Sequence, residues 1–158
     1  MAKILIVYYS RTGNTRRMAE LIKEGVVSEG VNVEMKRAED TTVDDLLKAD
    51  GIIMGSPTYY GTMAAELKKL VDDSVSHHGS LDGKVGAAFS SSANIGGGNE
   101  TTILDILKAM LIHGMIVQGD PRGDHYGPVS IGAPDKRSET MCKKLGERTA
   151  KLVKRLFG

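Results

Sequence analysis

The residues best suited to chemistry gather in short clusters that interrupt apolar runs. The first cluster is Ser10-Arg11-Thr12-Gly13-Asn14-Thr15, which follows the apolar run 4–9 and opens a helical pattern. Backbone N–H groups in the first turn of a helix have no intrahelical partner, and with the helix dipole they favour an anion. The hydroxyl and amide side chains add short donors, and Gly13 lets the backbone approach a ligand closely. The cluster therefore predicts a phosphate-binding loop.

The kind of phosphate follows from what the first cluster lacks. It has neither the lysine of the nucleoside-triphosphate loop G-x-x-x-x-G-K-[ST] nor the dinucleotide pattern G-x-G-x-x-G. A monophosphate therefore fits better than a triphosphate or a dinucleotide. An ordinary helix N-cap, with Asn14 or Thr12 as the capping residue, is the alternative that the sequence leaves open.

A second cluster, Ser56-Pro57-Thr58-Tyr59-Tyr60-Gly61, places two adjacent tyrosines beside a glycine. The chain has no tryptophan, five tyrosines and two phenylalanines, so this pair concentrates its aromatic surface. A flat ring ligand can stack on one tyrosine or lie against its edge. The alternative is that Tyr59 and Tyr60 cover the top of the hydrophobic core.

Two further clusters are rich in glycine. Ser90-Ser91-Ser92-Ala93-Asn94-Ile95-Gly96-Gly97-Gly98 exposes backbone N–H groups to whatever lies beside it, and its alternative interpretation is a flexible linker. The fourth cluster is Gly119-Asp120-Pro121-Arg122-Gly123-Asp124-His125-Tyr126-Gly127-Pro128.

The elements between the clusters must bring them together. Apolar runs predict buried strands at 4–9, 52–54, 85–89 and 115–117, and the alternating segment 31–35 predicts a strand near a sheet edge. Apolar residues at helical spacing predict helices within 15–26, 43–47, 63–71, 102–111 and 141–156. Such alternation implies parallel strands joined by right-handed crossovers, with helices on both faces. Because ligands of these sheets bind beyond the carboxyl ends of the strands, we expect all four clusters at that edge.

Length and charge limit the possible classes of protein. A chain of 158 residues fits one domain, 1–158, with one core. With 21 basic and 20 acidic side chains the net charge is +1, which gives no electrostatic reason to expect nucleic acid or a membrane surface as a partner. The basic stretch Lys143, Lys144, Arg148, Lys151, Lys154 and Arg155 is interpreted as a solvated helix face.

Cysteine and histidine usage further limits the compartment and the kinds of site to expect. The single cysteine, Cys142, allows no intrachain disulfide, which suits a reducing cytoplasm. No apolar segment approaches the ~20 residues of a membrane span, and the start does not resemble a signal peptide. The histidines His77, His78, His113 and His125 have no metal-ligand spacing, so we expect no metal site. We expect Cys142 to be a structural residue in spite of its lysine neighbours.

The clusters carry a resemblance to a known family. Ser10 to Thr15 resembles the phosphate-binding loop of flavodoxins, S/T-x-T-G-x-T, and the whole chain looks closest to the short quinone oxidoreductases similar to tryptophan repressor-binding protein. The matching stretches are AKILIVYYS (2–10), GSPTYYG (55–61), FSSSANIGGGNE (89–100), His113-Gly114-Met115 and Tyr126-Gly127. The resemblance implies a three-layer α/β sandwich around a five-stranded parallel sheet of order 2-1-3-4-5, and it implies flavin mononucleotide (FMN) as cofactor.

The family's FMN contacts carry over onto the first three clusters. Residues 10–15 would hold the phosphate. Pro57, Thr58, Tyr59, Tyr60 and Gly61 would contact the ring system. The polar edge of the ring would meet Ser91, Ser92, Ala93, Asn94, Ile95, Gly96 and Gly97, where N–H groups can stabilise negative charge on a reduced flavin.

Several features of the quinone reductases are absent. They carry two consecutive histidines before Gly-Met, whereas here Ile112 precedes His113. An aromatic residue of their phosphate loop, which approaches the nicotinamide cofactor, is replaced by Thr12. Their pocket tryptophan and two insertions also have no counterpart. These departures leave FMN binding untouched and bear only on the use of NAD(P)H and quinone.

The sequence is therefore compatible with three functions. The first is an FMN-dependent electron carrier that exchanges electrons with a partner protein, and the departures favour it. The second is an FMN-dependent NAD(P)H:quinone oxidoreductase with NAD(P)H as co-substrate, which overall similarity favours. The third is a binding module of the same fold without a redox role. The reductases form tetramers, so a homo-oligomer is a further expectation.

Overall fold

The apolar run near the start of the chain forms the centre of a parallel sheet. In the computed structural model, which describes residues 1–158, β1 (Lys3–Tyr8) lies between β2 (Asn32–Arg37) and β3 (Gly51–Pro57). Ile6 is level with Met35 on one side and with Ile53 on the other. β1 and β3 are buried on both faces, whereas most β2 residues are only half-buried, as expected for an edge strand.

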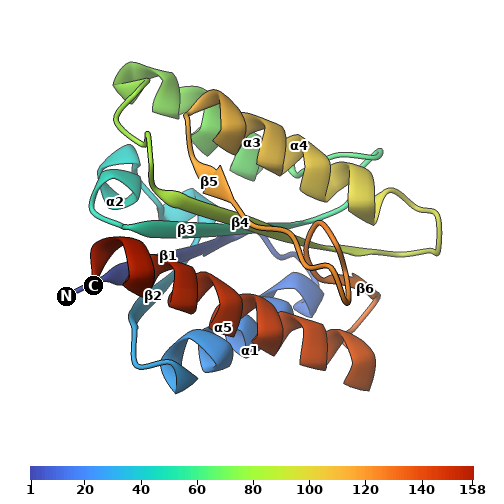
Figure 1. The fold of residues 1–158 in the computed structure, drawn as a ribbon. Coiled ribbons are helices and arrows are strands. Elements are labelled where there is room, and N and C mark those ends of the chain that lie inside the picture. Colours follow the sequence, from blue (N-terminus) through green and yellow to red (C-terminus); the bar gives the residue numbers. More distant parts are fainter.

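The predicted strand order is confirmed. β4 (Val85–Ser92) pairs with β3, and the order is β2-β1-β3-β4-β5 with every pair parallel. Because all strands run the same way, their carboxyl ends lie along one edge of the sheet (Figure 1).

The fifth position of the sheet differs from the prediction. It holds two short strands, β5 (Ile116–Val117) beside Val85 and Gly86, and β6 (Val129–Ile131) beside Ser90 to Ser92. Residues 118–128 leave the sheet between them. We expected the fourth cluster to follow the fifth strand at the carboxyl edge, and this expectation is wrong. The cluster instead lies between β5 and β6, along the side of the sheet.

Helices cover both faces, as predicted (Figure 1). α1 (Asn14–Ser28) and α5 (Lys136–Phe157) pack on one face around Phe89, whose ring fits because Gly55 has no Cβ to obstruct it. α2 (Val43–Leu47), α3 (Ala65–Asp73) and α4 (Asn99–Ile112) pack on the other face over Leu5 and Ile52. Two 3₁₀ turns, Ala38–Asp40 and Ser74–His77, complete the connections.

The two helices α1 and α5 approach each other closely. A Cβ on Gly25 would overlap the carbonyl of Lys143, and one on Gly146 would overlap the carbonyl of Ile22. Glycine at both positions therefore sets the spacing of this layer. None of the helices combines the length and apolar character needed to cross a bilayer.

Candidate functional site

The first cluster forms a loop that ends in an uncapped helix. α1 begins at Asn14, and its N-cap is Gly13 with φ 102°, a left-handed conformation that favours glycine. No side chain caps the helix, so the alternative of an ordinary N-cap by Asn14 or Thr12 is wrong. The hydroxyl of Ser10 instead accepts a hydrogen bond of 3.2 Å from the N–H of Gly13 and holds the loop closed. The N–H groups of the first helical turn therefore remain available to an anion.

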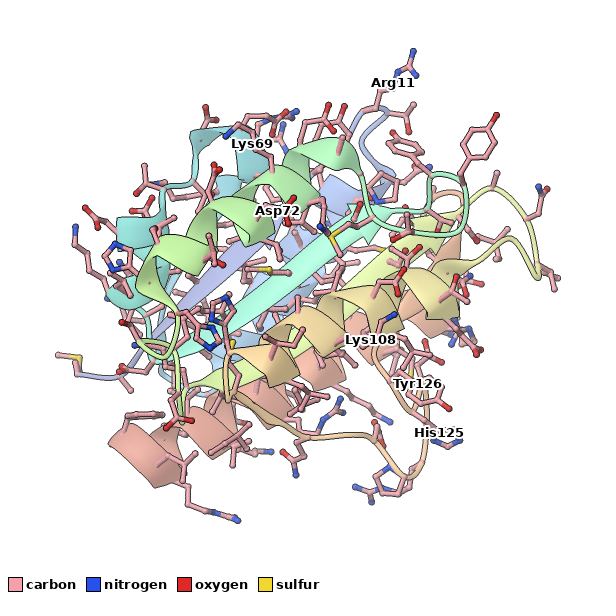
Figure 2. All side chains as sticks on the ribbon, turned by 90° about the horizontal axis from the view of Figure 1, so that it is seen from above. Arg11, Lys69, Asp72, Lys108, His125 and Tyr126 are labelled. Carbon is pink, nitrogen blue, oxygen red and sulfur yellow. The ribbon has the colours of Figure 1, made fainter.

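The side chains of this loop divide into two groups. Arg11 and Thr12 are exposed, and Arg11 projects away from the ribbon (Figure 2). Thr15 is buried, and its hydroxyl lies 2.9 Å from that of Ser91 on β4. In this structure the Thr15 hydroxyl therefore faces the sheet.

Arg37 was not among the predicted residues, although it lies beside the loop. It ends β2 level with Tyr8, and its guanidinium donates to the carbonyl of Ser10 at 3.3 Å and to Glu39 at 2.9 Å. The ion pair with Glu39 raises the pKa of Arg37. Arg37 could have been found from the sequence by its position after the strand that neighbours β1. Arg37 therefore anchors the loop at Ser10, while its charge is balanced by Glu39.

The tyrosine cluster forms a tight turn at the end of β3. The N–H of Tyr59 donates to the carbonyl of Thr62 at 2.9 Å, and the reverse bond is 3.2 Å. The two central residues, Tyr60 and Gly61, have φ of 49° and 80°, the signs of a type I′ turn. Tyr60 is the only non-glycine residue with positive φ, and its side chain is fully exposed. The alternative that both tyrosines cover the core is wrong, because Tyr59 is also more than a third exposed.

Tyr9 positions Tyr59 from the end of β1. Their rings meet edge to face, with centroids 6.2 Å apart and an interplanar angle of 74°. Burial and, after it, the nearby carboxylate of Glu66 raise the pKa of Tyr9, which keeps its hydroxyl protonated. The contact fixes the Tyr59 ring at the carboxyl edge beside the phosphate loop.

The third cluster is shorter as a loop than predicted. Ser90, Ser91 and Ser92 belong to β4 and are buried, and Pro57 of the second cluster is likewise the last residue of β3. The exposed loop runs from Ala93 to Gly97. It ends at Gly98, which has φ 104° and leaves α4 without a side-chain cap. A second set of free N–H groups therefore faces the same edge.

Hydroxyl groups join these loops to one another. Thr58 lies 3.2 Å from Ser90 and 2.9 Å from Thr102, hydroxyl to hydroxyl. Thr101 donates to the carbonyl of Gly61 at 2.7 Å. Thr101 and Thr102 were missed because α4 was read only for its apolar stripe. The network makes the edge rigid, since each buried hydroxyl has a partner.

Other predicted residues lie elsewhere. Tyr126 and His125 lie on the side of the sheet, well away from Arg11 (Figure 2). His113 caps the carboxyl end of α4, at the opposite edge of the sheet, where its Nε2 lies 2.7 Å from the Ser74 hydroxyl. Burial, and then His78, lower the pKa of His113.

Two expectations concern groups outside the site. No group of three or more histidine, cysteine, aspartate or glutamate residues is arranged to hold a metal ion. Cys142 is buried, as expected, and burial raises the pKa of its thiol to about 12. The lysines beside it in sequence do not activate it, because they point outward from the helix.

Comparison with known proteins agrees with this geometry. The family model of the flavodoxin domain matches residues 5–108. A flavodoxin from Aquifex aeolicus is 42% identical over 162 residues, covering 97% of this chain and 88% of that protein. An NAD(P)H dehydrogenase (quinone) from Archaeoglobus fulgidus is 32% identical over 190 residues, covering 99% and 100%. The solved structure of a flavodoxin from the domain Archaea superposes with a TM-score of 0.80 at 34% identity, covering 96% and 99%.

Proposed function

The chain belongs to the flavodoxin family, whose cofactor is FMN, and we propose that it carries electrons through one FMN held at the carboxyl edge of its sheet. The observation that carries the proposal is the start of α1, where Gly13 takes a left-handed conformation and no side chain occupies the free N–H groups. A phosphate monoester satisfies those groups and the helix dipole at once.

The phosphate would be held by residues 10–15. The backbone N–H groups of the loop donate to its oxygens, and the exposed hydroxyl of Thr12 adds a donor. The exposed Arg11 contributes positive charge, whereas Arg37, which is paired with Glu39, supports the loop through the carbonyl of Ser10. The buried Thr15 orients the loop through Ser91.

The ring system would lie across the ends of β1, β3 and β4. Tyr59 and Tyr60 offer it aromatic surface, and Pro57, Thr58 and Gly61 shape the turn that presents them. Residues 91–97 bring backbone N–H groups to its polar edge. Bound FMN supplies the redox chemistry, and the protein determines how readily it accepts electrons through these donors and through exclusion of water.

The lengths of the alignments favour an electron carrier over a quinone reductase. The match to the Aquifex flavodoxin extends over 162 positions, close to the 158 residues of this chain. The match to the quinone dehydrogenase extends over 190 positions, so that protein carries insertions that this chain lacks. The reductase remains the second candidate, since the same protein is 32% identical over nearly the whole chain.

A spectroscopic titration tests FMN binding. We expect the purified protein to show flavin absorption, or to bind added FMN with one site and quench its fluorescence. Protein that folds correctly but takes up no FMN would overturn the proposal and leave a binding module without a redox role. The Thr12→Val variant, which keeps the loop and removes one exposed donor, should bind FMN more weakly.

A second experiment separates the carrier from the reductase. Anaerobic NADH or NADPH should reduce the bound flavin slowly on its own and rapidly only when a flavodoxin reductase is added. Rapid steady-state oxidation of NAD(P)H with a benzoquinone would instead establish the reductase.

The docking site of the partner, the location in the cell and self-association are also proposals. We propose that the redox partner docks at the carboxyl edge, over the exposed turn 59–61 and loop 93–97. A cytoplasmic location agrees with a single buried cysteine, whose thiol needs no oxidising compartment. We propose that the chain forms a homo-oligomer, and sedimentation of the FMN-loaded protein tests this.

A further inference from the structure

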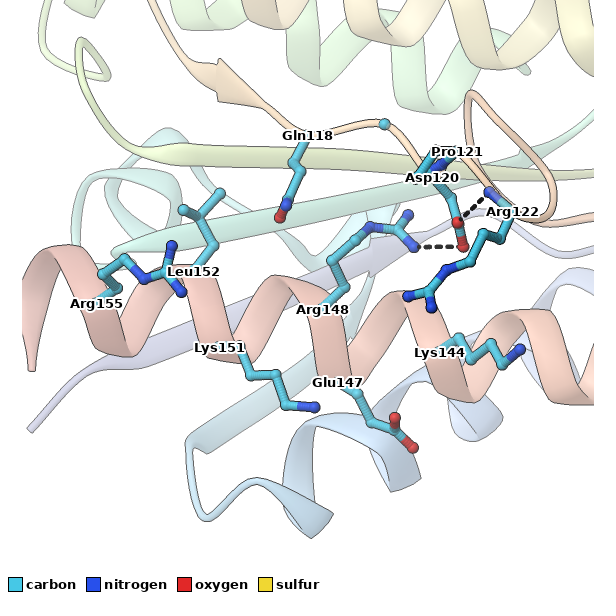
Figure 3. Close-up of a pocket in the computed structure, with 11 residues that line it drawn as sticks. Gln118, Asp120, Pro121, Arg122, Lys144, Glu147, Arg148, Lys151, Leu152 and Arg155 are labelled. Atoms are coloured by element: carbon cyan, nitrogen blue, oxygen red, sulfur yellow. Dashed lines mark hydrogen bonds and ion pairs between the residues drawn. The ribbon is translucent and has the colours of Figure 1, made fainter.

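The basic stretch of α5 is largely exposed, as interpreted from the sequence, and four of its six residues, Lys144, Arg148, Lys151 and Arg155, also line a groove. Residues 118–122, which leave the sheet between β5 and β6, pass beside α5, and an open cavity of about 590 Å³ lies between the two segments (Figure 3). Its walls are Gln118, Gly119, Asp120, Pro121 and Arg122 on one side, and Lys144, Glu147, Arg148, Lys151, Leu152 and Arg155 on the other. We call this cavity the α5 groove.

The α5 groove is cationic although the whole chain is nearly neutral. Five of its side chains are basic and two are acidic, whereas the net charge of the chain is +1. Leu152 is its one hydrophobic residue. Pockets of this volume usually have mostly apolar walls, so a ligand of this groove must be selected by charge.

One ion pair holds the two walls together. Arg148 donates from its guanidinium to a carboxylate oxygen of Asp120 at 2.9 Å, and the other oxygen accepts from the N–H of Arg122 at 2.9 Å. Both side chains of the pair are largely buried. The carboxylate of Asp120 therefore accepts a hydrogen bond from each wall, and Glu147 is the only other acidic residue that lines the groove.

Three cations of the groove form no ion pair in the structure. Arg122, Lys144 and Arg155 have no carboxylate within 4.0 Å, and Lys151 pairs only with Glu29, outside the groove. Arg122 reaches from its segment toward α5, between Arg148 and Lys144 (Figure 3). Glu147 points away from Asp120, toward the lower rim in the same view. Of these three cations, Arg122 lies between the walls, whereas Lys144 and Arg155 lie at opposite ends of the groove (Figure 3).

We propose that the α5 groove binds a small molecule with a chain of two or more phosphoryl groups, at a site separate from the FMN phosphate loop. Arginine forks donate two parallel hydrogen bonds to phosphate oxygens, and a lysine adds a point charge. Cations at both ends of the groove suit an extended polyanion better than a single phosphate. The volume accommodates a nucleoside diphosphate as well as inorganic polyphosphate.

The test is a titration of inorganic tripolyphosphate into ¹⁵N-labelled protein, with and without saturating FMN. Saturable shifts of the amides of residues 118–120, 122 and 144–155, unchanged by FMN, are expected. No saturable shift, or shifts confined to residues 10–15 that FMN abolishes, would overturn the proposal. The amide shifts report on the groove even when FMN does not bind, so the two proposals fail separately.

Charge-matched variants separate a built site from general surface charge. Arg122→Gln with Lys144→Gln should weaken tripolyphosphate binding by about tenfold or more, because both cations line the groove and neither is paired. The control, Lys23→Gln with Lys136→Gln, removes two exposed, unpaired lysines elsewhere and should change the affinity by less than about twofold. Equal losses in the two double variants would contradict a specific site.

Two further ligands identify the source of the phosphates. Tighter binding of ADP than of pyrophosphate at the same amides would indicate a nucleotide, and equal binding would indicate the phosphate chain alone, both within the proposal. Binding of a poly-glutamate peptide in the groove without any binding of tripolyphosphate would overturn it and indicate an acidic protein segment.

Discussion

The hydroxyl oxygens of Thr15 and Ser91 lie 2.9 Å apart, and this contact joins the start of α1 to the end of β4. Both side chains are buried, so each hydroxyl has few other partners. The phosphate loop is therefore fixed relative to the loop that would meet the polar edge of the ring. A ligand that spans the two loops finds their separation already set, which lowers the entropy cost of binding.

Removing either hydroxyl should destabilise the protein. Thr15→Val or Ser91→Ala leaves the remaining hydroxyl buried without its partner, which costs about 1–3 kcal/mol of unfolding free energy. The double variant should lose less than the sum of the two single losses, since neither unpaired hydroxyl remains. Urea unfolding of the parent, the two single variants and the double variant measures the coupling energy between the two hydroxyls. Strictly additive losses would show that the contact contributes nothing.

Gly13→Ala should affect both stability and FMN binding. A Cβ at φ 102° is strained by about 1–2 kcal/mol, and relaxation of the loop would turn its N–H groups away from the phosphate. Gly79→Ala is the matched control, because Gly79 has φ 88° in an exposed turn and, like Gly13, no neighbour within 4 Å of an added Cβ. We expect similar losses in thermal stability from both variants and weaker FMN binding from Gly13→Ala alone. Unchanged FMN affinity in Gly13→Ala would remove this loop from the site.

Tyr60→Asn should separate stability from binding. Asparagine tolerates the left-handed conformation of residue 60 better than tyrosine does, so the FMN-free variant should unfold at a temperature no lower than that of the parent. Its FMN affinity should fall by a few-fold up to about tenfold, because an aromatic contact is worth about 0.5–1.5 kcal/mol. Tyr126→Asn removes another exposed tyrosine, away from the site, and should leave the affinity unchanged.

Periodicity predicted the elements that are long or uniformly apolar. The central strands β1 and β3 and all five helices were recognised, because burial on one or both faces leaves a clear pattern. The phosphate-binding role of residues 10–15 was predicted from residue types alone, and it stays a prediction that the uncapped start of α1 supports.

The misses have tertiary causes. β6 has three residues, Val129 to Ile131, too few to show a period of two. Ser90 to Ser92 looked like loop because polar residues are rare in a buried strand. Their hydroxyls have hydrogen-bond partners on other elements, which are Thr58, Thr15 and Asn99 respectively. The α5 groove could not be predicted from the sequence, because its second wall, residues 118–122, is separated from α5 along the chain.

Acid should destabilise the protein through Asp45. This residue forms a capping box with Thr42 at the start of α2 and accepts a hydrogen bond of 2.8 Å from Lys36. Burial alone would raise the pKa of Asp45, but the hydrogen bonds from Lys36 and Thr42 outweigh it and lower the pKa from 3.8 to about 2. Because the folded protein binds this proton more weakly than the unfolded chain, the stabilisation is complete above pH ~4 and is lost as the pH falls toward ~2.

The size of this effect is about 2 kcal/mol, since one pKa unit corresponds to about 1.4 kcal/mol. Asp45→Asn should be less stable than the parent at pH 7, and the difference should shrink as the pH falls toward ~2. Asp44→Asn, at an exposed neighbour that forms no ion pair, is the control and should follow the parent over the whole range. Urea midpoints measured by circular dichroism between pH 2 and 7 test the prediction. A constant difference between Asp45→Asn and the parent would show that the Lys36 and Thr42 contacts do not control this titration.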